Sequence, residues 1–346
     1  PRGPWSCLTR AGALWARPTA PTMRPSAQAF TIDPPRAGAP PPPGSPRPST
    51  AVDRIHGAIE RILEDELGFG LSPEGFDVRI EALDTPVGPP AATPAPTATP
   101  RHAGLAVQRL GFCQAADGVR LAYATSGTGP PLIKAANWLT HLDYDWASPV
   151  WAHWWRGLSA HHRLVRYDER GCGLSEWNVP DTSYSLAASV RDLEAVVDTL
   201  GLDRFDLLGI SQGGAVAIEY AERHPKRVRK LVLYGAYAQG RVARGDSSEA
   251  IRVHELQSEL ARVGWGQNES SFRQVYTSPF MPGASKQLWN EFNELQRRST
   301  SPENAARLLK VTAYIDVSNA ACRVEAPTHV LHVRDDHRPP FEQGRL

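Results

Sequence analysis

The sequence predicts an α/β protein whose central sheet is mostly parallel and carries flanking helices on both faces. Three observations support this fold class. From about residue 108 onward, short apolar segments alternate with helical segments, the order that builds a parallel sheet. Apolar runs such as LVLYG lack the alternation of a half-exposed strand, so they fit strands covered on both sides. One strand also runs directly into a helix through the turn GISQGG.

The first 104 residues differ in composition from the rest. Residues 1–49 are rich in Pro, Ala, Arg and Ser and bury too little apolar surface to offset the entropy of ordering, so we expect disorder. Residues 50–84 predict a short helical segment, because apolar residues recur there at helical spacing. Residues 85–104 are a linker of Pro, Ala and Thr. The folded domain is therefore expected over residues 105–346.

Within this domain the elements follow one another in a regular order. Strands are predicted in 119–127, 130–136, 162–167, 205–210, 229–237 and 328–333. Helices are predicted over 185–202, ending at Gly201, over 213–225, and within a long stretch from about 247 to 310.

Ser211 lies at the turn between the strand 205–210 and the helix 213–225. A strand that enters a helix through Gly-x-Ser-x-Gly holds the serine in a strained backbone conformation at the apex. Small residues are needed around it, because side chains there would collide with the neighbouring strand or helix. Gly209, Gly213 and Gly214 meet this requirement. Ser211 is therefore predicted to be a nucleophile, and the alternative is a serine that only caps the helix.

Four segments together resemble the α/β-hydrolase fold family over about residues 105–346. They are ADGVRLAYATSGTGPPLIKAANW, RLVRYDERGCGLSE, GISQGGA and VEAPTHVLHVRDD. The resemblance implies a helical cap inserted at about 241–320. The subgroup most resembled occurs free-standing and joined to bacterial regulatory domains, and LEDELGFGLSPE resembles the end of the helical bacterial transcriptional activator domain.

The resemblance also implies a mechanism and its residues. Ser211 would attack an ester, thioester or amide and form an acyl-enzyme, with no metal and no organic cofactor. Asp336 would be the acid that orients the base, and Asp335 is the second choice. The oxyanion would be held by the backbone N–H groups of Gln212 and Trp138. Asn137 is the alternative to Trp138, because the chain has Ala136-Asn137 where the family usually has His-Gly.

Other polar residues of these motifs are expected to be structural. Asp168, Arg170 and Ser175, in the DERGCGLS segment, should hold the loop that follows their strand. His141 is expected on the oxyanion side of the pocket.

The base is missing from its expected place. The family's order is serine, acid, histidine, and the only histidine after Asp336 is its neighbour His337. Adjacent side chains cannot place one imidazole between its neighbour's carboxylate and Ser211 without severe distortion. We therefore expect a C-terminally truncated hydrolase whose histidine lies beyond Leu346 and which is inactive as this fragment. The alternative is a small-molecule-sensing module attached to a transcriptional or signalling regulator.

The net charge, the hydropathy and the cysteine spacing of the chain bear on which partners it can bind. A formal net charge of +1 predicts no electrostatic attraction to nucleic acid or to an anionic membrane. No apolar run approaches the roughly 20 residues that cross a bilayer. The four cysteines are scattered, without metal-ligand spacing, which predicts no disulfide framework and a reducing bacterial cytoplasm. A small-molecule substrate is the partner that remains.

Overall fold

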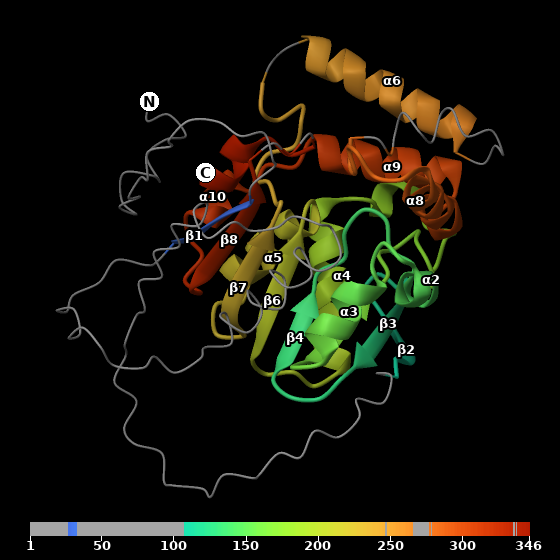
Figure 1. The fold of residues 1–346 in the computed structure, drawn as a ribbon. Helices are drawn as coiled ribbons and strands as arrows, with labels where there is room; N and C mark the ends of the chain where they lie inside the picture. The colour runs from blue at the N-terminus through green and yellow to red at the C-terminus, as the bar shows by residue number, and fades with distance from the viewer. Residues whose placement is uncertain are drawn as a thin grey trace, which may run out of the picture.

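The computed structural model describes residues 27–32, 107–245, 248–265, 277, 279–334, 336 and 338–346, the first of these ranges by its backbone alone. Within these ranges the chain forms an eight-stranded sheet with the order β1-β8-β7-β6-β4-β5-β3-β2 (Figure 1). The strands are β1 (Ala27–Ile32), β2 (Arg109–Gln114), β3 (Arg120–Ser126), β4 (Pro131–Lys134), β5 (Arg163–Tyr167), β6 (Phe205–Ile210), β7 (Val228–Tyr234) and β8 (Thr328–Val333).

Helices connect and cover these strands. The described α-helices are α2 (Leu142–Ala147), α3 (Ala152–Ser159), α4 (Leu186–Thr199), α5 (Gly213–Arg223), α6 (Ser248–Gly264), α8 (Lys286–Ser299), α9 (Pro302–Ala313) and α10 (Ser318–Ala321). Two short 3₁₀ helices, η2 (Asp181–Ser183) and η3 (Phe341–Arg345), complete the described elements. All the strands and helices predicted for the folded domain are confirmed, with bounds shifted by a few residues.

The centre of the sheet is parallel, as predicted. β4 pairs in parallel with β5 and with β6, β6 with β7, and β7 with β8. Antiparallel pairs stand only towards the edges, where β2 and β3 form a hairpin, β3 pairs with β5, and β1 pairs with β8. Because parallel strands end on the same side, the carboxyl ends of β4, β6, β7 and β8 meet at one edge of the sheet.

β1 corrects the expectation of disorder over residues 1–49. Its six residues pair antiparallel with β8, from Ala27 opposite Val333 to Ile32 opposite Thr328. Without β1, that side of β8 would present unpaired backbone N–H and C=O groups, and an extended segment can satisfy them whatever the composition around it. The predictions for the rest of residues 1–104 fall outside the described residues.

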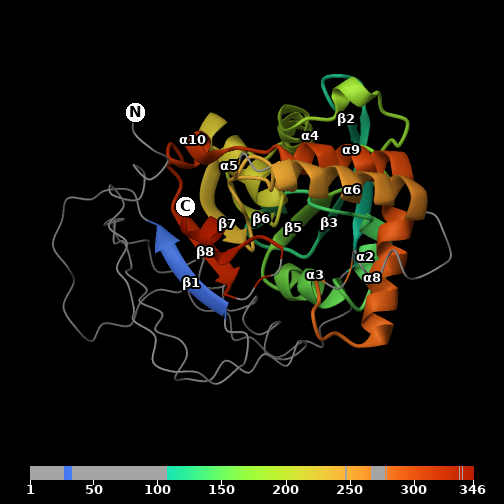
Figure 2. The same cartoon turned by 90° about the horizontal axis from the view of Figure 1, so that it is seen from above.

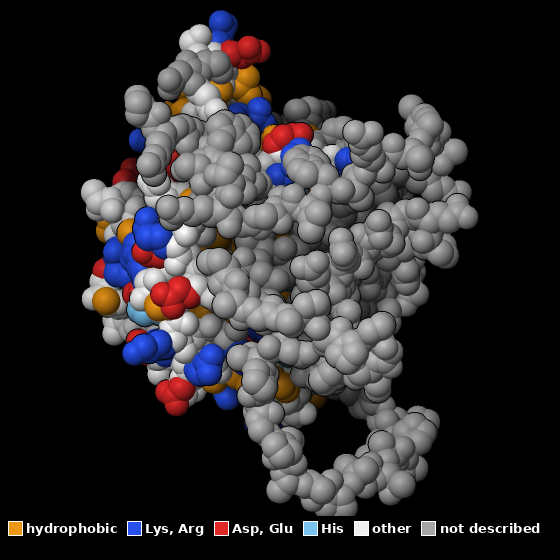
Figure 3. Space-filling view, turned by 90° about the vertical axis from the view of Figure 1, so that its left-hand side faces the viewer, with side chains coloured by type: hydrophobic (Ala, Val, Ile, Leu, Met, Phe, Trp, Pro, Cys, Tyr) orange, Lys and Arg blue, Asp and Glu red, His pale blue; other side chains and the backbone are white. Residues whose placement is uncertain are grey.

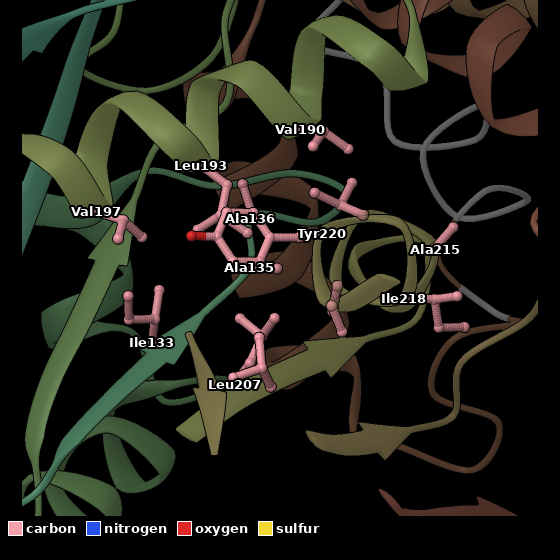
Figure 4. Close-up of a cluster of buried hydrophobic side chains, with 14 of the residues drawn as sticks. Ile133, Ala135, Ala136, Val190, Leu193, Val197, Leu207, Ala215, Ile218 and Tyr220 are labelled. Carbon is pink, nitrogen blue, oxygen red and sulfur yellow. The ribbon is translucent and has the colours of Figure 1, made fainter. Parts of the chain in front are cut away.

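Two apolar clusters hold helices on the two faces of the sheet. Figure 2 shows α4, α5 and α10 on one face and α3 on the other. The larger cluster joins β4, β6 and β7 to α4 and α5. In Figure 4, Ile133 and Leu207 lie on its sheet side, with Leu193 of α4 and Tyr220 of α5 across from them. Each such buried aliphatic or aromatic side chain contributes about 1.5–3 kcal/mol relative to an exposed one.

α4 shows how the sequence sets a helix and its buried face. The Ser185 hydroxyl accepts a hydrogen bond from the N–H of Ala188 at 3.1 Å and so caps the first turn. Gly201, with φ +59°, follows the last turn in the left-handed conformation that glycine tolerates. Between them, Leu193 and Val196 lie on the face buried against the sheet.

Helices α6, α8 and α9 lie over the carboxyl edge of the sheet (Figure 1), in the stretch expected to form the cap. Hydrogen bonds fasten α8, α9 and Thr300, which lies between them, to the loop after β5. The N–H of Gly173 donates to the Ser299 carbonyl at 2.7 Å, and the Thr300 hydroxyl donates to the Gly171 carbonyl at 2.6 Å. Asn304 of α9 also donates to the Gly171 carbonyl, at 3.2 Å. The cap and the loop after β5 therefore form one packed unit above the strand ends.

The described surface carries charges of both signs. In the described part of the face in Figure 3, blue Lys and Arg side chains alternate with red Asp and Glu side chains, without a large patch of one sign. Among the described helices, none combines the length and the apolar character needed to cross a membrane.

Candidate active site

Ser211 occupies the strained turn that the sequence predicts. It directly follows β6 and precedes α5, and its φ of +52° is the one positive value among the described non-glycine residues. Its N–H donates to the Tyr234 carbonyl at 3.0 Å, and its carbonyl accepts from the N–H of Gly214 at 3.0 Å. The side chain is half-buried. Such a conformation costs of the order of 1–3 kcal/mol and persists only where the surroundings enforce it.

The glycines around Ser211 are required by close backbone packing. A Cβ on Gly209 would lie 2.6 Å from the Cα of Gly214, and one on Gly214 would lie 2.3 Å from the Cβ of Ala236. A Cβ on Gly213 would lie 2.6 Å from the Ala136 carbonyl oxygen. The turn is therefore wedged between the strand before it, the segment after β7 and the loop after β4. The predicted reason for the small residues is confirmed.

Gln212 is the N-cap residue of α5, and its side chain reaches the loop after β4. Among the described residues, no acceptor takes its backbone N–H, which stands at the positive end of the helix dipole. An N–H group in this position can donate to an anion. The Trp138 N–H, the second predicted donor, is in a different state, because it donates to Oε1 of the Gln212 side chain at 2.8 Å. The N–H of Asn137, the alternative donor, meets no described acceptor.

A buried polar chain continues from Gln212 to Glu169 and Ser189. Gln212 Nε2 donates to Glu169 Oε1 at 3.3 Å, and the Ser189 hydroxyl donates to the same oxygen at 3.1 Å. Burial raises the pKa of Glu169 to about 7, with a further contribution from the negative charge of Asp192. This network was not foreseen from the sequence, because its members come from three separate segments.

Asp336 lies beside the same strand end as Ser211. One oxygen of its carboxylate, Oδ1, accepts from the N–H of Arg338 at 2.7 Å. The other, Oδ2, would be 3.6 Å from a Cβ placed on Gly235. Since Ser211 bonds to the Tyr234 carbonyl, both predicted catalytic residues adjoin the segment Tyr234–Gly235. Asp335 and His337 fall outside the described residues.

The described histidines near this edge have other partners. The ring Nδ1 of His141 accepts from the N–H of Tyr144 at 3.2 Å and caps α2. His332, fully buried in β8, bonds through Nε2 to the Pro339 carbonyl at 3.0 Å. In the described part of the chain, no hydrogen bond joins a histidine ring to Ser211.

The polar residues after β5 hold their loop, as predicted. Asp168 accepts from the N–H groups of Leu142 and Leu174, at 3.1 and 2.8 Å. The guanidinium of Arg170 is fully buried and pairs with Asp192 and Asp117. In the same loop, the Ser175 hydroxyl donates to the Asp168 carbonyl at 2.8 Å and accepts from the N–H of Ala122 at 2.9 Å.

The indole of Trp138 belongs to the cap interface. It packs edge-on against Trp265 with the ring centroids 5.7 Å apart, in a cluster that includes Leu308 of α9. Trp138, the second predicted oxyanion donor, is thus held by two contacts. Its indole packs against the cap, and its backbone N–H bonds to the Gln212 side chain.

No group of three or more His, Cys, Asp or Glu side chains in the described ranges is arranged to hold a metal ion. Cys113 and Cys172 are free and buried. Cys322 is disulfide-bonded, whereas the scattered cysteines of the sequence predict no disulfide framework. Spacing along the chain does not reveal which cysteines approach one another in space.

Comparisons with known proteins agree with the fold. A family model described as the alpha/beta hydrolase fold matches residues 142–338. The chain is 28% identical over 230 residues to the pyrrolizixenacetamide deacetylase of Xenorhabdus hominickii, which covers 65% of this chain and 81% of that protein. It is 26% identical over 236 residues to a 2-hydroxy-6-oxononadienedioate/2-hydroxy-6-oxononatrienedioate hydrolase of Paraburkholderia phymatum, covering 65% and 78%.

A solved structure shows the same fold. The esterase from Exiguobacterium antarcticum superimposes with a TM-score of 0.55 at 22% identity, over 68% of this chain and 84% of that one. At this level of identity, the similarity supports the fold alone.

The raised pKa of Glu169 predicts a pH-dependent effect of Glu169→Gln on stability. The folded state keeps this proton up to about pH 7, whereas the unfolded chain loses it near the ordinary value of 4.5. Wild-type stability contributed by this group therefore falls as the pH rises through that window. Glutamine cannot ionise, so the unfolding free energy of the variant relative to wild type should increase by about 2–3 kcal/mol between pH 5 and pH 8.

Urea unfolding at the two pH values measures this difference. The matched control is Glu249→Gln at an exposed position on α6, which should change the unfolding free energy equally at both pH values. A pH-independent difference for Glu169→Gln would contradict the buried carboxyl described here.

Proposed function

The chain belongs to the α/β-hydrolase fold family, and on that premise we propose that it is a serine hydrolase with Ser211 as nucleophile and Asp336 as acid. One observation carries the proposal. Ser211 adopts φ +52° at a strand-to-helix turn whose glycines leave no room for a Cβ. A strained residue that its surroundings enforce is typical of a functional position.

The reaction that fits this arrangement is acyl transfer to water. The Ser211 hydroxyl attacks the carbonyl carbon of an ester, thioester or amide, while a base takes the hydroxyl proton. The carbonyl oxygen becomes an oxyanion, and the leaving group departs with the proton that the base returns. Water then attacks the acyl-enzyme in the same way and releases the acid.

The oxyanion would be held first by the N–H of Gln212. This donor has no described acceptor, lies next to the nucleophile, and stands at the N-terminus of α5. Removing one donor from such a hole costs about 100- to 1,000-fold in turnover in enzymes of this chemistry. The N–H of Trp138 is proposed as the second donor, after it is released from the Gln212 side chain.

The names of the relatives support a small carbonyl substrate. One relative is named a deacetylase and another a hydrolase of an unsaturated oxo-diacid. We propose an ester, thioester or amide for this chain, because the serine nucleophile suits all three. A cytoplasmic location and attachment to a regulatory domain stay predictions from the sequence.

Labelling of Ser211 tests the nucleophile directly. A fluorophosphonate probe phosphonylates a serine nucleophile, so it should modify Ser211 of the 346-residue chain, slowly because no described residue supplies the base, and leave Ser211→Ala unmodified. The matched control Ser285→Ala, at the N-cap of α8, should be labelled like wild type. Saturable binding of a small molecule without any labelling would favour the alternative of a sensing module.

The base is the one member of the proposed triad to which no described residue is assigned. The described residues that follow Asp336 include no histidine, whereas the family's order places the base there. Removing the histidine from a well-studied serine protease costs about a million-fold in turnover and leaves roughly a thousand-fold catalysis over water. The 346-residue chain should therefore hydrolyse p-nitrophenyl acetate barely above background.

Turnover of p-nitrophenyl acetate is compared between the 346-residue chain and Ser211→Ala at equal concentration, with the variant as the blank. Rapid turnover by the 346-residue chain that disappears in both Ser211→Ala and His141→Ala would instead identify His141 as the base.

A further inference from the structure

The peptide groups next to Trp138 are held by two side chains. The Trp138 N–H donates to Gln212 Oε1 at 2.8 Å, and the Trp138 carbonyl accepts from Asn137 Nδ2 at 3.1 Å. All three residues are buried. The N–H group that the proposed oxyanion hole requires is therefore already satisfied by an acceptor within the protein.

The orientation of the Gln212 amide is set by its two neighbours. Its carbonyl faces an N–H donor, and its NH₂ group faces the Glu169 carboxyl at 3.3 Å. Turning the amide over would place an NH₂ group against the Trp138 N–H and a carbonyl against a carboxyl oxygen. Ser189 donates to the same Glu169 oxygen and fixes the carboxyl from the side of α4. The amide cannot turn over without losing hydrogen bonds.

We infer that the Gln212 side chain, held in place by Glu169, occupies the Trp138 N–H in the free protein and so blocks the oxyanion hole. When an oxyanion forms, the Gln212 carbonyl moves away and the Trp138 N–H donates to the oxyanion instead. The inference rests on the proposed function, because it assumes that an acyl oxyanion forms beside Ser211. The backbone N–H of Gln212 stays a direct donor to the oxyanion, whereas its side chain and Glu169 are positioning residues that act through Trp138.

This arrangement stabilises the transition state more than the bound substrate. A neutral substrate carbonyl is no stronger an acceptor than the Gln212 carbonyl. The substrate carbonyl therefore does not displace the Gln212 carbonyl from the Trp138 N–H. An oxyanion is an ionised acceptor, whose hydrogen bonds are roughly twice as strong as neutral ones. The Trp138 N–H is therefore gained only as negative charge develops, which is how binding energy raises turnover rather than affinity. The site should prefer tetrahedral anionic groups to neutral carbonyl compounds.

Gln212→Met tests the inference. Methionine has a similar length and no carbonyl, so the Trp138 N–H should stay open. The second-order rate constant for fluorophosphonate labelling of Ser211 should rise about 3- to 10-fold, the factor expected when a neutral hydrogen bond no longer has to break. The hole acts with or without the base, so the comparison applies to the 346-residue chain. Hydrogen exchange at the Trp138 amide should also become faster.

Two variants of Glu169 complete the design. Glu169→Gln keeps an acceptor for Gln212 Nε2, so its labelling rate should stay within about twofold of wild type. Glu169→Leu removes that acceptor and frees the Gln212 amide to move, so labelling should accelerate as in Gln212→Met. This second route keeps the test decisive where Gln212→Met does not fold.

The outcomes are distinguishable. Labelling of wild-type protein no faster than that of Ser211→Ala would defeat the proposed function and this inference together. Labelling that depends on Ser211 but is unchanged or slower in folded Gln212→Met and Glu169→Leu would overturn the inference alone. In that case Gln212 would serve to support the Trp138 segment, and the N–H of Asn137 would be the second donor. Fast exchange of the Trp138 amide in wild-type protein would also overturn it.

Discussion

The strained turn at Ser211 is the constraint on which the rest of the site depends. Its left-handed backbone is unfavourable for a side-chain-bearing residue, and it is held by close packing against Ala136, Ala236 and the Tyr234 carbonyl. These contacts join the ends of β4, β6 and β7, three adjacent strands of the sheet. The packing of the turn against the strand ends therefore positions Ser211. The glycines are needed because a larger side chain would prevent this close packing.

The same packing brings the loop after β4 against the start of α5. Gln212 then reaches Trp138 with its carbonyl and Glu169 with its NH₂ group. Trp138 in turn packs on Trp265 of the cap. A chain of contacts thus runs from the loop after β5, through the nucleophile turn, to the helices above the strand ends. A displacement of the cap would therefore move Trp138, one of the predicted oxyanion donors, more directly than Ser211.

Features encoded in short segments could be predicted from the sequence, and features made by distant pairs could not. The strand 205–210 and the turn at Ser211 follow from local apolar runs and glycine spacing. The antiparallel pairing of β1 with β8 and the link from Trp138 through Gln212 to Glu169 join residues far apart in the chain. The burial of Lys134 in β4 likewise depends on the segments packed around it, and this burial lowers the pKa of Lys134 to about 8.

A crystal structure of the protein labelled with a fluorophosphonate would test the proposed site most directly. The phosphonyl group should be attached to Ser211, with one of its oxygens about 2.7–3.1 Å from the backbone nitrogens of Gln212 and Trp138. The Gln212 side chain should have turned away from the Trp138 N–H. A phosphonyl group on another residue, or one on Ser211 whose oxygens point away from both nitrogens, would contradict the proposed active site.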